Sequence, residues 1–138
     1  MLFAVIDTNI LVSALLKFDS IPGLVVEQIF RGNITPVLHD DIVDEYRGVL
    51  SREKFAFNLY SVNALINRLL YRGIFVEPAE VDIYLPDAKD EIFYATALTA
   101  RECIDNDAQI ITGNMKHFPN VSFAVTPREA LNLLLQRG

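Results

Sequence analysis

The first apolar run of the chain ends in a single carboxylate, and this junction limits the folds that the chain can adopt. Leu2–Ile6 is a run of five apolar residues, and Asp7 follows it directly. A continuous apolar run of this length predicts a strand that is buried on both faces, as in a parallel sheet. In open α/β sheets, ligands bind beyond the carboxyl ends of the strands. Asp7 is therefore a candidate metal ligand or catalytic base, and it is equally a candidate cap of the helix that follows.

The remaining chain alternates between short apolar runs and longer amphipathic segments. Strands are predicted at residues 2–6, 34–38, 74–76, 109–112 and 123–125. Helices are predicted at residues 8–16, 20–31, 40–50, 53–57, 59–72, 88–104 and 127–136. This order predicts an α/β fold with three layers, α/β/α, around a central, mostly parallel sheet of about four or five strands. Thr8 is the expected N-cap of the first helix, and Pro36 predicts that the second strand is irregular or near an edge.

Length and composition favour one folded domain, residues 1–138. An apolar fraction of 51% supplies a substantial core, and the formal net charge of −6 argues against broad, non-specific phosphate binding. Bound divalent cations would offset several of these acids locally. Cys103 is the only cysteine, which excludes an intrachain disulfide and fits the cytoplasm. We see neither a signal peptide nor an apolar run of the roughly 18 residues that a membrane span needs, so we expect a cytoplasmic protein without a membrane partner.

Three further polar residues occupy positions at which chemistry is expected. Glu45 lies at the margin of the apolar face of the predicted helix 40–50, Asp90 lies near the start of helix 88–104, and Asn114 follows the fourth strand. Each also has an ordinary role. Glu45 can be a solvated acid, Asp90 can take part in a capping arrangement with Asp87, and Asn114 can form a turn.

Taken together, these positions converge on one edge of the sheet. Asp7 and Asn114 end two strands, Asp90 opens a helix that would follow the same edge, and Glu45 reaches it from the flank. Three carboxylates and an amide offer only oxygen donors. This donor set suits Mg²⁺ or Mn²⁺ and does not suit zinc or copper.

Other chemistries have weaker support. The sequence has neither a GxxxxGK nor a GxGxxG phosphate loop. His39 and His117 lack a partner at zinc spacing, and His117 is expected to be structural or to face substrate rather than to bind metal. Ser13, Ser51 and Ser61 do not occur in a nucleophile-elbow context.

Four motifs, in this order and spread over nearly the whole chain, resemble those of PIN-domain ribonucleases. They are Asp7-Thr8-Asn9, Asp44-Glu45-Tyr46, Lys89-Asp90-Glu91-Ile92-Phe93-Tyr94-Ala95 and Thr112-Gly113-Asn114. The segments 45–52 and 112–119 are similar to those of the bacterial branch that contains VapC-like toxins of toxin–antitoxin pairs.

The resemblance implies a PIN-like fold and a Mg²⁺- or Mn²⁺-dependent endoribonuclease. Asp7, Glu45 and Asp90 match the metal-binding acids of the family, and Asn114 stands at a fourth catalytic position that is often Asp. The missing charge is expected to weaken any second metal. Thr8, Asn9 and Thr112 are the expected supporting residues.

The expected reaction is hydrolysis of RNA phosphodiester bonds, with cations on the surface contacting the RNA backbone. The candidate contacts, each of which is also an ordinary solvated side chain, are Arg52, Lys54, Lys89 and Lys116. The resemblance also implies a small antitoxin protein as partner and a homodimer. Apolar residues of two predicted helices could form a groove for the antitoxin, or could simply pack in the core: Leu24, Val25, Ile29, Leu65, Leu69 and Leu70.

Two alternatives remain at this point. A non-catalytic PIN-like module that binds protein or RNA is suggested by Asn114 and by the acidic net charge. A metal-dependent phosphatase acting on small phosphoesters is less well supported, because the sequence lacks the Asp-x-Asp-x-Thr pattern that such α/β enzymes usually carry.

Overall fold

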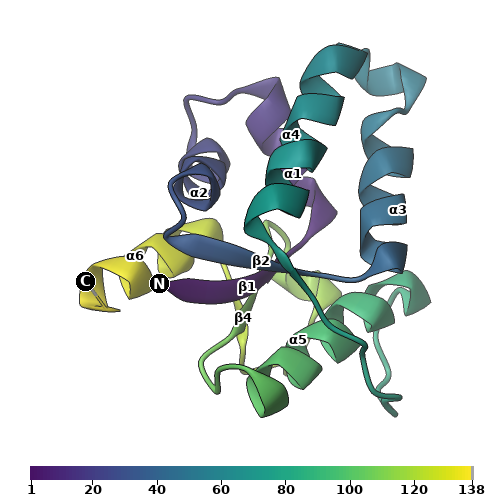
Figure 1. Ribbon diagram of the computed structural model, residues 1–138. Helices are drawn as coiled ribbons and strands as arrows, with labels where there is room; N and C mark the ends of the chain where they lie inside the picture. Colours follow the sequence, from purple (N-terminus) through teal and green to yellow (C-terminus); the bar gives the residue numbers. More distant parts are fainter. Residues whose placement is uncertain (138) are drawn as a thin grey trace.

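A parallel sheet with helices on both faces forms the centre of the molecule, as the computed structural model of residues 1–137 shows (Figure 1). The strands run in the order β3-β2-β1-β4-β5, and every neighbouring pair is parallel. Their bounds are β1 (Leu2–Ile6), β2 (Ile34–Leu38), β3 (Ile74–Phe75), β4 (Gln109–Ile111) and β5 (Ala124–Val125). The predicted three-layer α/β/α architecture with a parallel sheet is confirmed.

The helices enclose the sheet from both sides. Their bounds are α1 (Thr8–Leu16), α2 (Ile21–Phe30), α3 (Asp40–Leu50), α4 (Leu59–Arg72), α5 (Glu91–Cys103) and α6 (Pro127–Arg137). Short 3₁₀ turns lie at η1 (Glu53–Phe55), η2 (Ala88–Asp90) and η3 (Met115–His117). In Figure 1, α1, α2 and α4 lie on one side of the sheet and α5 on the other, while α3 packs against α1, α4 and α5 at the flank.

The central strand β1 anchors the helix that flanks its carboxyl end. Val5 and Ile6 of β1 are fully buried. The hydroxyl of Tyr46, on α3, donates a hydrogen bond of 2.5 Å to the carbonyl oxygen of Ile6, and the Tyr46 ring lies 6.4 Å from that of Phe93 on α5. Burial raises the pKa of Tyr46 well above its ordinary value, so this hydroxyl keeps its proton and remains a donor. The bond fixes α3 beside the residue that follows β1, which is Asp7.

Two local expectations need correction. The strand that contains Pro36 was expected to be irregular or near an edge, and the edge alternative is wrong, because β2 lies between β1 and β3. Pairing with β3 starts only at Val37, so the residue that lacks an N–H stands outside that ladder. Thr8 is not the N-cap of α1: Asp7 occupies that position, and Thr8 is the first residue inside the helix.

The apolar residues of α2 and α4 mostly pack in the core. Val25, Ile29, Leu65 and Leu69 are buried, which confirms the core interpretation for these four, whereas Leu24 is exposed. Within residues 1–137, no single helix combines the length and the apolar character of a membrane span. α1 and α2 taken together have both, but the chain bends by 105° between them.

Candidate functional site

The carboxyl ends of the two central strands bring distant polar residues together. β1 and β4 are neighbours, with Ile6 paired to Ile111, and the backbone N–H of Asp7 donates to the carbonyl of Ile111 at 2.9 Å. Asp7 therefore lies next to Thr112, although the two are 105 residues apart in sequence. The pattern of strand ends predicted that Asp7 and Asn114 lie at this edge, and the structure places Thr112, two residues before Asn114, beside Asp7.

Asp7 stands at the N-cap position of α1, but its side chain does not cap the helix. It is almost completely buried, and its Oδ2 accepts hydrogen bonds from Thr112 Oγ1 at 2.7 Å and from Asn9 Nδ2 at 3.2 Å. Asn9 is itself fixed, because its Oδ1 accepts from the N–H of Gly113 at 3.0 Å. Asn9 and Thr112 thus hold the Asp7 carboxylate in place beside the edge of the sheet.

Asp90 is brought to the same site by a 3₁₀ turn. Helix α5 starts at Glu91 and not at Ala88, because η2 forms the first turn and Asp87 caps it by accepting from the N–H of Lys89 at 2.9 Å. The Asp90 carboxyl is buried, and no described residue donates a hydrogen bond to it. Burial, and after it the charge of Asp7, raises the pKa of Asp90 from 3.8 to about 6.

Glu45 approaches from α3, at the flank. It is half-buried, and the hydroxyl of Thr8 donates a hydrogen bond to its Oε2. Ligand atoms of Asp7, Asp90 and His117 lie within 4.8 Å of one another, and Glu45 is not a member of this tight group. Glu45 nevertheless lines the same groove, joined to its floor through Thr8.

The side chain of Asn114 faces His117, which in turn faces Asp7. The Asn114 side chain is exposed and caps η3, since its Oδ1 accepts from the N–H of Lys116 at 3.1 Å. Its Nδ2 lies 3.2 Å from His117 Nε2, and His117 Nδ1 lies 3.3 Å from Asp7 Oδ2. Sequence reasoning did not place His117 beside the carboxylates. The signal was its spacing of three residues from Asn114, which puts the two side chains together in a 3₁₀ turn.

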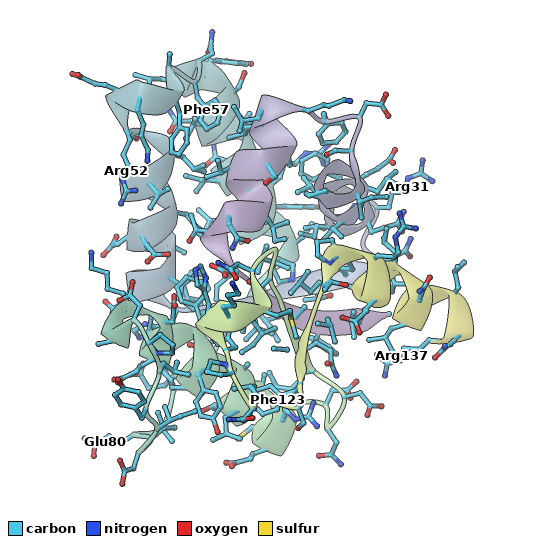
Figure 2. All side chains as sticks on the ribbon, turned by 180° about the vertical axis from the view of Figure 1, so that it is seen from behind. Arg31, Arg52, Phe57, Glu80, Phe123 and Arg137 are labelled. Carbon is cyan, nitrogen blue, oxygen red and sulfur yellow. The ribbon has the colours of Figure 1, made fainter. Side chains whose placement is uncertain are left out.

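Asp7, Glu45, Asp90 and His117 border a hollow of about 320 Å³, which we call the polar groove. It is lined by Asp7, Thr8, Asn9, Val12, Glu45, Val49, Arg52, Phe55, Asp87, Lys89, Asp90 and His117. Two of the four candidate RNA contacts, Arg52 and Lys89, therefore lie on its border, and Arg52 extends from the end of α3 (Figure 2). Lys54 instead lies over the ring of Phe55, at 5.0 Å from its centroid, and Lys116 is exposed in η3 outside the groove lining.

The donor set of the polar groove fits a hard divalent cation. Two buried carboxylates, Asp7 and Asp90, face each other without a paired lysine or arginine among the described residues, and a third, Glu45, stands at the rim. Burial and the charge of Asp7 raise the pKa of Asp90, so a positive charge between the two acids would stabilise their ionised forms. A bound cation would supply that charge, and carboxylate oxygens are the ligands that Mg²⁺ and Mn²⁺ prefer.

Comparison with known proteins agrees with this geometry. The model of the PIN domain family matches residues 4–116, which include Asp7, Glu45, Asp90 and Asn114. Neither the curated proteins nor the solved structures that were searched contain a match to the chain. PIN domains are generally nucleases, and a group that could hold a metal lies where the matched motifs converge. The match covers most of the chain, from β1 into η3, and the chain therefore belongs to the PIN-domain family.

Proposed function

We propose that this PIN domain is a Mg²⁺- or Mn²⁺-dependent endoribonuclease that acts as the toxin of a toxin–antitoxin pair. The observation that carries the proposal is the pair of buried carboxylates, Asp7 and Asp90, in a groove bordered by Arg52 and Lys89. Negative groups that can gather a cation thus lie beside positive groups that can hold a phosphate backbone.

The cation would be held by Asp7 and Asp90, with Glu45 contributing directly or through water. Mg²⁺ usually keeps several waters, so not every acid has to touch it. The chemistry that such a cation supplies is activation of water and neutralisation of the charge that develops on the phosphate.

The chain's own residues prepare the groove for this role. Thr112 and Asn9 fix Asp7, and Thr8 fixes Glu45, so the acids are oriented before substrate arrives. Arg52 and Lys89 would bind RNA phosphates at the border of the groove. Because the acids repel RNA when no cation is present, the reaction should require the metal.

A cleavage assay tests the catalytic proposal. Purified protein would be offered labelled RNA, single-stranded DNA and a chromogenic phosphate ester, each with Mn²⁺, Mg²⁺ or EDTA. We expect internal cleavage of RNA that is lost in EDTA and in Asp7→Asn and Asp90→Asn. Asp44→Asn is the matched control, because Asp44 is an exposed acid on α3 next to Glu45. RNA cleavage that persists in both site variants would exclude the proposed site.

The toxin role rests on the family resemblance and on an apolar pocket of about 300 Å³ between α1, α2 and α4. It is lined by Ala14, Leu15, Phe18, Val26, Phe30, Tyr60, Ser61, Ala64, Leu65 and Arg68. We propose that an antitoxin segment with apolar side chains binds there, and that the toxin forms a homodimer. Induced expression in bacteria should arrest growth with the wild type and not with Asp7→Asn, and light scattering of the purified protein should give the mass of a dimer.

A binding module without catalysis is the competing proposal, because the fourth catalytic position holds Asn114 and its amide faces His117. The same cleavage assay distinguishes the two. RNA binding without cleavage under every metal condition would favour the module.

A further inference from the structure

His117 lies between Asp7, the proposed ligand of the cation, and Asn114, which stands where the family often has an aspartate. Its ring is held at both nitrogens: Nδ1 lies 3.3 Å from Asp7 Oδ2, and Nε2 lies 3.2 Å from Asn114 Nδ2. His117 lines the polar groove and falls just beyond the residues that the family model matches. Its role therefore has to be worked out from its own contacts. It can act either as a nitrogen ligand of the cation or as a donor to Asp7.

The side-chain amide of Asn114 decides between these roles. Its Oδ1 accepts the backbone N–H of Lys116 at 3.1 Å, so the oxygen is turned toward η3. The group that faces His117 is consequently the NH₂ group, which only donates hydrogen bonds. The orientation is thus assigned from the hydrogen bond that the backbone N–H of Lys116 donates to Oδ1.

An NH₂ group opposite Nε2 requires that nitrogen to accept. In a neutral imidazole one nitrogen carries the proton and the other accepts, so the proton of His117 is on Nδ1. The Nδ1–H group points at Asp7 Oδ2. A nitrogen that carries a proton has no free lone pair for a metal, so in this arrangement Nδ1 is a donor and not a ligand.

The Oδ2 atom of Asp7 can accept a third hydrogen bond, from His117. The same atom already accepts from Thr112 Oγ1 and from Asn9 Nδ2, and the N–H of His117 completes the set around this oxygen. No described residue donates to Oδ1 of Asp7, which leaves that oxygen for the cation, together with Asp90. One carboxylate oxygen is thus used for anchoring and the other is available for binding.

We propose that Asn114 holds neutral His117 in the Nδ1–H tautomer, and that His117 is thereby a positioning residue for Asp7 and not a ligand of the cation. This inference rests on the proposed function in one respect, the assignment of Asp7 as a cation ligand. Aspartate at position 114 would change the arrangement at Nε2. Its carboxylate can only accept, so Nε2 would have to carry a proton, whether or not Nδ1–H still donates to Asp7.

Nitrogen NMR of histidine-labelled protein reads the tautomer directly. The chain has two histidines, so His117→Gln identifies the His117 signals, and His39 is an internal reference. At about pH 8, where a free imidazole is neutral, we expect Nδ1 of His117 to resonate as a protonated nitrogen and Nε2 as an unprotonated one. In Asn114→Asp, Nε2 should instead resonate as a protonated nitrogen, since aspartate still caps η3 but accepts from the ring. A wild type with the proton on Nε2, or an Asn114→Asp protein with an unchanged pattern, would overturn the proposal.

Two variants of His117 separate positioning from a merely structural role. Asparagine places an amide where Nδ1 stands and can still donate to Asp7, whereas glutamine carries its amide beyond that point. We expect His117→Gln to weaken Mn²⁺ binding by roughly tenfold, as loss of a hydrogen-bond partner of a ligand does, and His117→Asn to restore most of it. His39→Gln should bind Mn²⁺ as the wild type does. Equal loss in the asparagine and glutamine variants would contradict a donor role.

Electron spin-echo spectra of the Mn²⁺-loaded protein test the ligand role by itself. We expect spectra without coupling to a directly bound nitrogen. A nitrogen coupling that disappears in His117→Gln would show that His117 is a ligand and would overturn the proposal. All three measurements are independent of RNA cleavage. Failure of the proposed ribonuclease therefore appears in the cleavage assay, and failure of the tautomer assignment appears in the nitrogen spectra.

Discussion

The polar groove and the apolar pocket share helix α1 but are built on opposite principles. Thr8 and Val12 of α1 face the groove, while Ala14 and Leu15 of the same helix line the pocket. The groove lies at the carboxyl ends of β1 and β4, where backbone and hydroxyl donors allow Asp7 to be buried. The pocket lies one to two turns farther along, where α1, α2 and α4 leave a gap between apolar side chains.

The polar groove and the apolar pocket contribute to the stability of the fold with opposite signs. Burying Asp90 next to Asp7 without a donor is unfavourable and is revealed by the raised pKa of Asp90. Burying Leu65 at the floor of the pocket is favourable, because it removes apolar area from water. Substitutions in the groove should therefore act mainly on function, and substitutions in the floor of the pocket mainly on stability.

The largest expected effect is on RNA cleavage. Asp7→Asn should lower the cleavage rate by more than roughly a hundredfold, because it removes a charge that holds the cation. Loss of a residue that only hydrogen-bonds to a metal ligand costs up to about a hundredfold, and loss of the ligand itself should cost more. Ala64→Arg, which partly fills the apolar pocket, should leave cleavage of free RNA unchanged. Initial rates at saturating Mn²⁺ measure both. If Ala64→Arg were as inactive as Asp7→Asn, the two hollows would not be functionally separate.

The next effect is on stability, and here a substitution in the apolar pocket should have a larger effect than one in the polar groove. Leu65→Ala removes a buried side chain from the floor of the pocket and should lower the free energy of unfolding by about 2–5 kcal/mol. Val49→Ala, in the half-buried lining of the groove, should cost less than about 1 kcal/mol. Urea denaturation measures both variants. Similar losses in the two variants would mean that the groove lining is as much a part of the core as the pocket floor.

Much of the groove could be predicted from the sequence because it depends on strand ends. Asp7 follows an apolar run, and parallel strands bring their carboxyl ends to one edge whatever the loops do. Asp90 was predicted on the same ground, because its helix leaves that edge. These placements needed only the alternation of strands and helices and no knowledge of side-chain geometry. Thr112 was expected as a supporting residue only from the family resemblance.

The finer geometry of the site depends on contacts that periodicity does not encode. Thr8 was expected as a cap and is instead a donor to Glu45, because Asp7 already occupies the N-cap position. Asn114 was expected among the oxygen donors and instead faces His117 across the turn of η3. Both outcomes depend on which partner each polar side chain meets in the folded protein. That partner is decided by the tertiary structure and not by the sequence pattern.

A smaller stability effect should follow the charge of Asp90. The pKa of Asp90 is about 6 in the folded protein and 3.8 in the absence of the fold. The native state therefore binds the proton more tightly, and its stabilising contribution is complete below about pH 4 and is lost as the pH rises through about 6. Metal-free Asp90→Asn should thus be more stable than the wild type at pH 7, by no more than about 2 kcal/mol because the carboxyl opens onto the groove.

Thermal unfolding in EDTA between pH 4 and 7 measures this effect. Asp87→Asn is the matched control, since Asp87 is exposed and asparagine can still cap η2. The control should retain most of the pH dependence of the wild type, because the charge of Asp87 raises the pKa of Asp90 less than burial and Asp7 do, and Asp90→Asn should reduce it. If the stability of Asp90→Asn fell with rising pH as steeply as that of the wild type, a group other than Asp90 would be responsible for the pH dependence.

The smallest effect should come from the cations at the border of the groove. Arg52 borders the groove, and Arg31 lies on the far side of the molecule in an exposed ion pair with Glu27 (Figure 2). In an Asp7→Asn background, which prevents cleavage, Arg52→Ala should weaken binding of single-stranded RNA severalfold and reduce the salt slope by about 0.7, the value for one phosphate contact. Arg31→Ala should change neither. Fluorescence anisotropy at several salt concentrations measures both quantities. Equal losses of RNA affinity in the two arginine variants would mean that only the net charge of the protein affects RNA binding. The polar groove would then not be the site at which the RNA backbone binds.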